Sequence, residues 1–170
     1  MNKQVFREYD IRGIVENDFP DEFVLNLGKA YGTYLKNNNH TNISVSGDIR
    51  FTTNRLKDVL TQGLLEVGIN VYDMGILPTP VNYFSLYHTD IVNSVQITGS
   101  HNPKEYNGFK ISFNKKPFFG KQIQQLYKII LQESYYNTNE KGKVRKIDIL
   151  EDYVNVIKND IKIIKDINSV

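Results

Sequence analysis

The chain has 170 residues, 40% of them hydrophobic and 24% charged, with a formal net charge of +2 and no cysteine. This length and composition indicate one globular domain with its own core and exclude disulfides and thiolate sites. Because so small a net charge gives no footprint for nucleic acid, and no apolar run approaches the ~20 residues of a membrane span, we expect neither partner. No secretory signal follows Met1, so we expect a cytoplasmic protein.

The N-terminal segment, residues 5–12, has the sequence VFREYDIR and is followed by Gly13. Its composition predicts a short strand and a solvated turn. Arg12 beside a glycine also suits a bidentate grip on phosphate or carboxylate, because glycine leaves room for an approaching group.

Further along the chain, apolar residues at helical spacing alternate with short β-branched runs. The spacing predicts helices over residues 19–36, 52–67, 81–88 and 121–131, and strands over residues 43–45, 69–74, 91–97 and 108–113. Thr52 or Thr53 is expected to cap the second of these helices. Alternating strands and helices predict an α/β fold, a three-layer α/β/α sandwich with a mixed, mostly parallel sheet.

The C-terminal part of the chain is polar over residues 134–146, which predicts a loop or an edge segment. A last amphipathic helix is predicted from Leu150 to Val170, without a clear stop. We expect residues 1–147 to form an α/β domain and residues 148–170 to lead into a further domain of a larger protein.

The stretch TGSHNPKEYNGFK, residues 98–110, joins two predicted strands. The connection is too short for a crossover helix, so we expect the two strands to be antiparallel neighbours. Ligands of open α/β sheets bind at the carboxyl ends of the strands. The segments that start at Tyr9, Asp48 and Thr98 are therefore expected at one edge of the sheet.

Ser100 is the candidate nucleophile of this stretch. A serine triad is disfavoured because Ser100 and His101 are adjacent, so that their side chains should diverge, and because the G-x-S-x-G elbow is missing. Phosphoryl transfer fits better. A phosphoserine carries roughly −1.5 to −2 charges and requires cations and amide donors around it.

Such groups are concentrated near Ser100: four cationic or titratable side chains, and a turn at Asn102-Pro103 that together with Gly99 could present amide donors. The four side chains are Lys104, His101, Lys110 and Arg12. Lys110 alternates with Phe109 and Ile111, so it should face away from the core. The alternative is that the lysines are solvated and Ser100 is an ordinary turn residue.

Two segments, FREYDIRG at residues 6–13 and TGSHNPKEYNGFK at residues 98–110, resemble the α-D-phosphohexomutase superfamily, and its phosphomannomutase/phosphoglucomutase branch in particular. The turn Pro78-Thr79-Pro80 fits as well. The resemblance runs from about Phe6 to Tyr153 and covers only the first, N-terminal domain of a four-domain family.

The resemblance implies an isomerase that acts as an intramolecular phosphotransferase. Ser100 would carry a phosphoryl group, pass it to a hexose 1- or 6-phosphate, and recover the other phosphate from the bisphosphate. Either His101 or Lys110 would be the general acid/base. The implied catalytic residues are Ser100, His101, Lys110 and Arg12, and the implied substrate- or phosphate-binding residues are Tyr9, Asn102, Lys104 and Arg50.

The resemblance also implies a Mg²⁺ ion bound to the phosphoryl oxygen on Ser100. Its other ligands would come from an Asp-Gly-Asp-Gly-Asp motif in a second domain, which this sequence lacks. The partners would be mannose or glucose phosphates and the remaining domains of the polypeptide, and this chain alone would be inactive. The alternative is a non-catalytic anion-binding or interaction module.

One segment departs from the family pattern Gly-Arg-Asp-x-Arg, since this chain has Ser46-Gly47-Asp48-Ile49-Arg50. The aspartate and second arginine match, but Gly47 replaces the first arginine. Thr52 and Thr53 stand where serines are usual.

Overall fold

The computed structural model describes residues 2–161. Its centre is a seven-stranded sheet with the order β1-β5-β4-β2-β3-β7, and β6 pairs with β5. The three pairs that join β4, β2, β3 and β7 are parallel, and the pairs of β5 with β1, β4 and β6 are antiparallel. The strands are β1 (Ile11–Ile14), β2 (Asn42–Gly47), β3 (Asn70–Ile76), β4 (Ser94–Ile97), β5 (Tyr106–Phe113), β6 (Lys116–Pro117) and β7 (Val144–Lys146).

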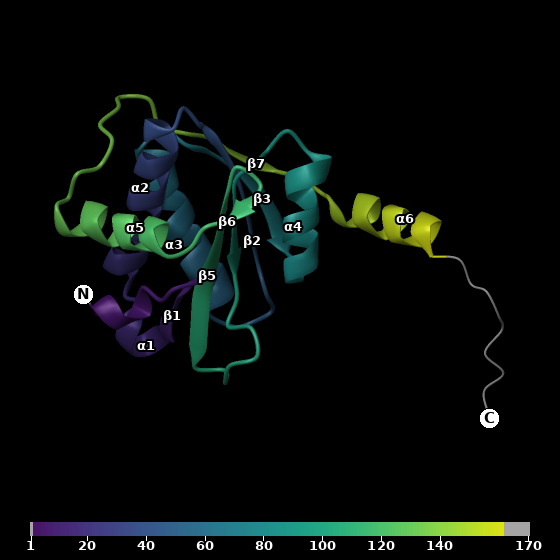
Figure 1. Ribbon diagram of the computed structural model, residues 1–170, viewed down its shortest axis with the longest axis horizontal. Coiled ribbons are helices and arrows are strands. Elements are labelled where there is room, and N and C mark those ends of the chain that lie inside the picture. The colour runs from purple at the N-terminus through teal and green to yellow at the C-terminus, as the bar shows by residue number, and fades with distance from the viewer. Residues whose placement is uncertain (1, 162–170) are drawn as a thin grey trace.

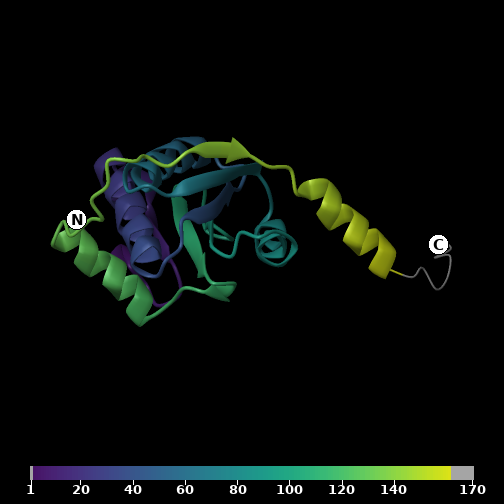
Figure 2. The same cartoon turned by 90° about the horizontal axis from the view of Figure 1, so that it is seen from above.

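Helices cover both faces of the sheet, which confirms the predicted α/β/α sandwich (Figure 1). Figure 2 shows α2, α3 and α5 on one face and α4 on the other, while α6 extends away from the body of the domain. The helices are α1 (Val15–Asp18), α2 (Asp21–Asn37), α3 (Thr53–Glu66), α4 (Thr79–His88), α5 (Lys121–Leu131) and α6 (Leu150–Asp160), and a 3₁₀ turn spans Lys3–Val5.

The main core lies between the sheet and the layer of α2, α3 and α5. Helices α2 and α3 cross closely because two glycines, Gly28 and Gly63, meet there. A Cβ on Gly63 would overlap the carbonyl oxygen of Leu25 and lie 2.9 Å from the amide nitrogen of Lys29. The two glycines therefore set the distance between these helices.

The opposite face of the sheet is polar where α4 covers it. Ser44, Ser94 and Ser112 face one another across β2, β4 and β5, and all three are buried. Asn82 of α4 donates to Ser46 Oγ over 2.7 Å and accepts from Ser94 Oγ over 2.8 Å. Helix α4 is thus attached to the sheet largely by hydrogen bonds, with a small apolar cluster near Met74 and Val81 beside them.

Several predicted elements differ from the observed ones. The predicted N-terminal strand at Val5 is a 3₁₀ turn, and the strand follows the charged turn as β1. The short helix α1 was not predicted. Helix α6 ends at Asp160, where Ile161 adopts extended backbone angles, and the rest of the predicted helix, residues 162–170, lies outside the described residues.

Two predictions about the sheet are confirmed. Strands β4 and β5 are antiparallel neighbours, with Ile97 opposite Phe109. The polar segment before α6 contains β7, which pairs with β3 at the edge of the sheet. No helix among residues 2–161 is long and apolar enough to cross a membrane.

Candidate active site

The loop that joins β4 to β5, residues 98–105, carries Ser100 and is called the Ser100 loop below. Ser100 is exposed, and its φ of 54° lies in the left-handed region that a non-glycine residue rarely adopts. Its amide donates to Thr98 Oγ1 over 2.9 Å. The serine hydroxyl is therefore presented to solvent by a fixed, strained turn.

The side chain of His101 lies beside this hydroxyl. Ser100 Oγ and His101 Nδ1 are 3.5 Å apart, so the prediction that the two adjacent side chains diverge is wrong. The left-handed backbone at Ser100 brings them to the same side of the turn. At 3.5 Å, the contact is at the outer limit of a hydrogen bond.

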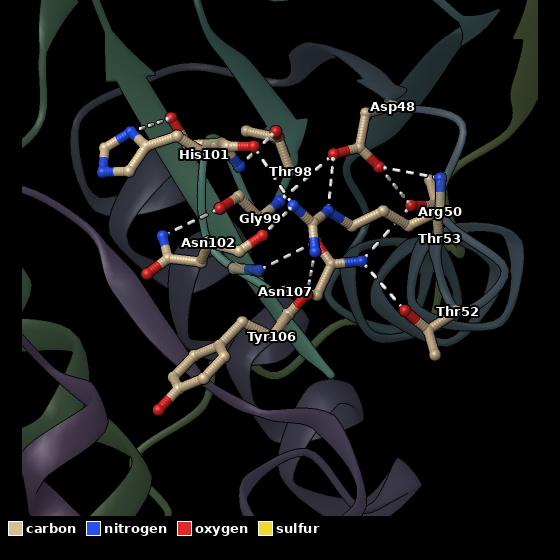
Figure 3. A network of polar contacts seen from close by, with 12 residues as sticks. Asp48, Arg50, Thr52, Thr53, Thr98, Gly99, His101, Asn102, Tyr106 and Asn107 are labelled. Atoms are coloured by element: carbon tan, nitrogen blue, oxygen red, sulfur yellow. Dashed lines mark hydrogen bonds and ion pairs between the residues drawn. The ribbon is translucent and has the colours of Figure 1, made fainter. Parts of the chain in front are cut away.

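Arg50 lies beneath the Ser100 loop, with its guanidinium surrounded by backbone oxygens (Figure 3). Nη1 donates to the carbonyls of Pro103 and Tyr106 over 2.6 and 2.9 Å. Nη2 donates to the carbonyls of Ser100 and Asn102 over 3.1 and 2.7 Å. Nε donates to Asp48 Oδ2 over 3.3 Å, so all five N–H groups of this guanidinium have an acceptor within the chain.

Asp48 connects Arg50 to the start of the Ser100 loop. It accepts from the amide of Arg50 over 3.1 Å and from the amide of Gly99 over 3.2 Å. Burial pushes the pKa of Asp48 up, but hydrogen bonds from Arg50, Thr98, Thr53 and Gly99 outweigh it, so the pKa lies below its usual value. Asp48 is therefore a carboxylate around neutral pH and balances part of the charge of Arg50.

The two threonines at the start of α3 do not cap that helix with their side chains, contrary to the prediction. Thr53 Oγ1 donates to Asp48 Oδ1 over 2.8 Å. Asn107, which is fully buried, donates to Thr52 Oγ1 over 3.0 Å and to Thr53 Oγ1 over 3.2 Å. The hydroxyls thus connect α3 to the end of β2 and to β5 (Figure 3).

A second group of charges, Asp10, Arg12 and Lys110, lies on the polar face of the sheet. Arg12 is opposite Gly108 of β5, whose carbonyl accepts from the amide of Thr98 over 3.0 Å. Asp10 pairs with Arg12 Nη2 and lies 3.5 Å from Lys110 Nζ. Arg12 Nε is buried and has no acceptor among the described residues.

Asp10, which is 7% exposed, holds the two predicted catalytic cations together. Burial, and then the negative charge of Asp10, raise the pKa of the Tyr83 phenol on α4. Asp10 was not predicted as a site residue. Its place between Arg12 and Lys110 depends on the pairing of β1 with β5, which sequence spacing alone does not reveal.

The remaining predicted residues divide between a groove and its surroundings. A groove of 610 Å³ in front of the Ser100 loop is within the size range of small-molecule sites, and its lining comprises Asp48, Ile49, Arg50, Pro78, Thr79, Thr98, Ser100, Asn102 and Lys104. The amide side chain of Asn102 donates to Gly99 O over 2.9 Å and closes the loop. Tyr9 is 75% exposed, and its ring lies 6.3 Å from that of Phe119.

The described residues do not build a metal site by themselves. No group of three or more His, Asp or Glu side chains within residues 2–161 is placed to hold a metal ion. The Mg²⁺ ion that the resemblance implies would need ligands beyond these residues.

Comparison with known proteins assigns the chain to a family. Residues 3–137 match the family model described as phosphoglucomutase/phosphomannomutase, alpha/beta/alpha domain I. The chain belongs to this family. Phosphomannomutase/phosphoglucomutase from Pseudomonas syringae is 39% identical over 157 residues, which are 92% of this chain and 33% of the relative. Phosphomannomutase from Vibrio cholerae is 33% identical over 88% of this chain and 33% of the relative.

The solved structures agree. A phosphoglucomutase/phosphomannomutase family protein from Burkholderia thailandensis has a TM-score of 0.91 and 31% identity, over 97% of this chain and 37% of that chain. The chain thus spans about a third of the length of the first relatives that it matches. The N-terminal and Ser100 segments fall within the matched residues.

Proposed function

We propose that this chain is the N-terminal, phosphoserine-bearing domain of a phosphomannomutase/phosphoglucomutase that interconverts hexose 1- and 6-phosphates. The observation that carries the proposal is the placement of Ser100. Its exposed hydroxyl stands at a groove lined by polar and cationic groups, on a loop that Arg50 holds from below. The mannose- and glucose-phosphate mutases named above support the substrate class.

The reaction consists of two phosphoryl transfers. A free hydroxyl of the hexose phosphate attacks phosphorus on Ser100, the bond from phosphorus to Oγ breaks, and a hexose bisphosphate forms. After the bisphosphate reorients in the site, Oγ attacks the other phosphorus and the second hexose monophosphate leaves. In each step one P–O bond forms and one breaks, and the proton of the attacking hydroxyl moves to a base of the site.

The chain offers groups for each of these tasks. His101, 3.5 Å from Oγ, and Lys110 are the candidates that hold or move the proton. Arg12 and Lys110, held together by Asp10, supply positive charge for the transferred phosphoryl group. Lys104 and Asn102 line the groove where the sugar phosphate would bind, and Tyr9 is exposed on the loop before β1.

We further propose that residues 1–147 form this domain and that α6 leads into the next one. Binding of Mg²⁺ to the phosphoryl oxygen of Ser100 would then be completed by ligands from that domain. No step above is assigned to the metal, because the described residues do not form its site. The isolated chain is expected to turn over no hexose phosphate.

The test uses the full-length polypeptide that contains this chain. Intact-mass analysis should find one phosphoryl group that maps to Ser100, and Ser100→Ala should remove both the label and the mutase activity. Ser134→Ala is the matched control, since Ser134 is exposed in a polar segment and should change neither. If the protein carries no phosphoryl group and Ser100→Ala causes no loss of activity, the non-catalytic anion-binding or interaction module is the better explanation.

A further inference from the structure

We propose that Arg50 is a positioning residue that sets the shape of the Ser100 loop and does not itself bind phosphate. This inference rests on the proposed function, since it explains how Ser100 and the amides beside it are presented. The prediction from sequence placed Arg50 among the phosphate-binding residues, and the hydrogen bonds of the structure indicate the different role.

The first argument is the use of its donors. A guanidinium has five N–H groups and no acceptor, and here each N–H already has a partner: Asp48 and the carbonyls of Ser100, Asn102, Pro103 and Tyr106. Its side chain is only 16% exposed. A phosphate could gain a hydrogen bond from Arg50 only if a backbone carbonyl lost one.

The second argument is that the chain leaves space for this guanidinium. A Cβ on Gly99 would overlap Cζ of Arg50 and lie 2.6 Å from Nη1. Gly99 therefore lets the planar group lie flat against the loop backbone. Asp48 accepts from Arg50 Nε and from the amide of Gly99, which fixes the guanidinium and the loop relative to each other.

The third argument concerns the direction of the peptide groups. In a planar trans peptide, the N–H of one residue points opposite to the carbonyl of the residue before it. The carbonyls of Ser100 and Pro103 point at Arg50, so the amides of His101 and Lys104 point away from it. Neither amide has an acceptor among the hydrogen bonds of the described residues.

These arguments give Arg50 a specific task. By drawing the carbonyl oxygens of Ser100 and Pro103 inward, it turns the amides of His101 and Lys104 outward, as donors for phosphoryl oxygens. A lysine has only three donors on a point charge and cannot satisfy the same set of carbonyls. The planar shape of the guanidinium at position 50, and not only its positive charge, should therefore determine mutase activity.

The first experiment measures hydrogen exchange of the peptide that spans residues 98–108 in this chain. Arg50→Ala and Arg50→Lys should both speed exchange at least about tenfold, because several charged hydrogen bonds are lost. Arg55→Ala is the control, since Arg55 pairs with Asp21 at the surface and should leave the loop unchanged. Unchanged exchange in Arg50→Ala would overturn the proposal, and this result does not depend on whether the parent protein is a mutase.

The second experiment measures mutase kinetics of the full-length polypeptide. Arg50→Ala should lower kcat about 10²-fold, as expected for a misplaced reacting group, with KM changed only a few-fold. Millimolar guanidinium should restore part of kcat, and methylammonium at the same ionic strength should not. A large rise in KM, substantial activity in Arg50→Lys and no rescue by guanidinium would instead identify Arg50 as a phosphate ligand.

Discussion

Gly47 and Thr53, two of the three departures from the family pattern near Arg50, lie against each other and should compensate each other. A Cβ added to Gly47 would overlap the Cγ2 methyl of Thr53 and lie 3.3 Å from the carbonyl oxygen of Ile97. Serine, the usual family residue at position 53, has no such methyl. The methyl of Thr53 thus fills the space that a side chain at position 47 would need.

The size of the effect follows from this contact. Gly47→Ala alone forces an extra methyl into a buried site next to a fully buried Thr53, which should destabilise the fold by about 1–3 kcal/mol. Thr53→Ser alone removes one buried methyl and should cost about 1 kcal/mol. In the double variant the alanine methyl takes the place of the threonine methyl, so the total should be at least about 1 kcal/mol smaller than the sum.

Urea unfolding of the wild type, Gly47→Ala, Thr53→Ser and the double variant measures the free energy of coupling between the two positions. The serine hydroxyl can keep the hydrogen bonds of Thr53 to Asp48 and from Asn107, so polar contacts contribute little to the difference. Additive effects of the two substitutions would refute the reasoning. The slope of unfolding against urea should stay constant across the set, which keeps the comparison valid.

Three further changes test other parts of the structure. Gly63→Ala should destabilise the fold by about 2–3 kcal/mol in urea unfolding, because its Cβ would overlap the Leu25 carbonyl and push α2 from α3. The folded pKa of Asp48 lies below its usual 3.8, so its stabilisation is present above about pH 4 and is lost as the pH falls through the lower folded pKa. The stability gap between the wild type and Asp48→Asn should therefore shrink from about pH 6 to about pH 3, and a constant gap would contradict this. Asp10→Asn should leave two neighbouring cations uncompensated, with a loss of about 2 kcal/mol in stability and a lower kcat in the full-length protein; full activity of that variant would argue against its holding role.

The fold was largely predictable because its signals are local. The apolar spacing of α2, α3 and α5 and the short connection between β4 and β5 each follow from a few neighbouring residues. The N-terminal segment was harder, because Val5 and Ile11 are both buried apolar residues and either one can begin a strand. What decides for Ile11 is its pairing with Phe109, nearly a hundred residues away.

The candidate site shows the same division between local and distant signals. The candidate nucleophile and its neighbours form one continuous motif, so the sequence alone singles out Ser100, His101 and Asn102 together. Arg50 is singled out by its place in a motif, yet its proposed task could not be inferred from sequence, because the carbonyls that it binds lie about fifty residues further along the chain. A sequence lists the side chains, but the direction of the backbone carbonyls is known only from the structure.

The polar face of the sheet explains why the predicted cations can lie where they do. On the face toward α2 and α3, the sheet carries fully buried apolar residues such as Ile97 and Phe109, and an uncompensated charge there would be very unfavourable. On the α4 face, Lys110 lies beside Gln96, which in turn pairs with Ser46. The side chain of Lys110 is 27% exposed. Helix α4 bonds to β2 and β4 through Asn82, so the β1–β5 end of this face is left for Arg12, Lys110 and Asp10. A large apolar residue in place of Asn82 should therefore displace α4 and, through it, shift Lys110. A crystal structure of Asn82→Leu in which α4 and Lys110 keep their positions would contradict this account.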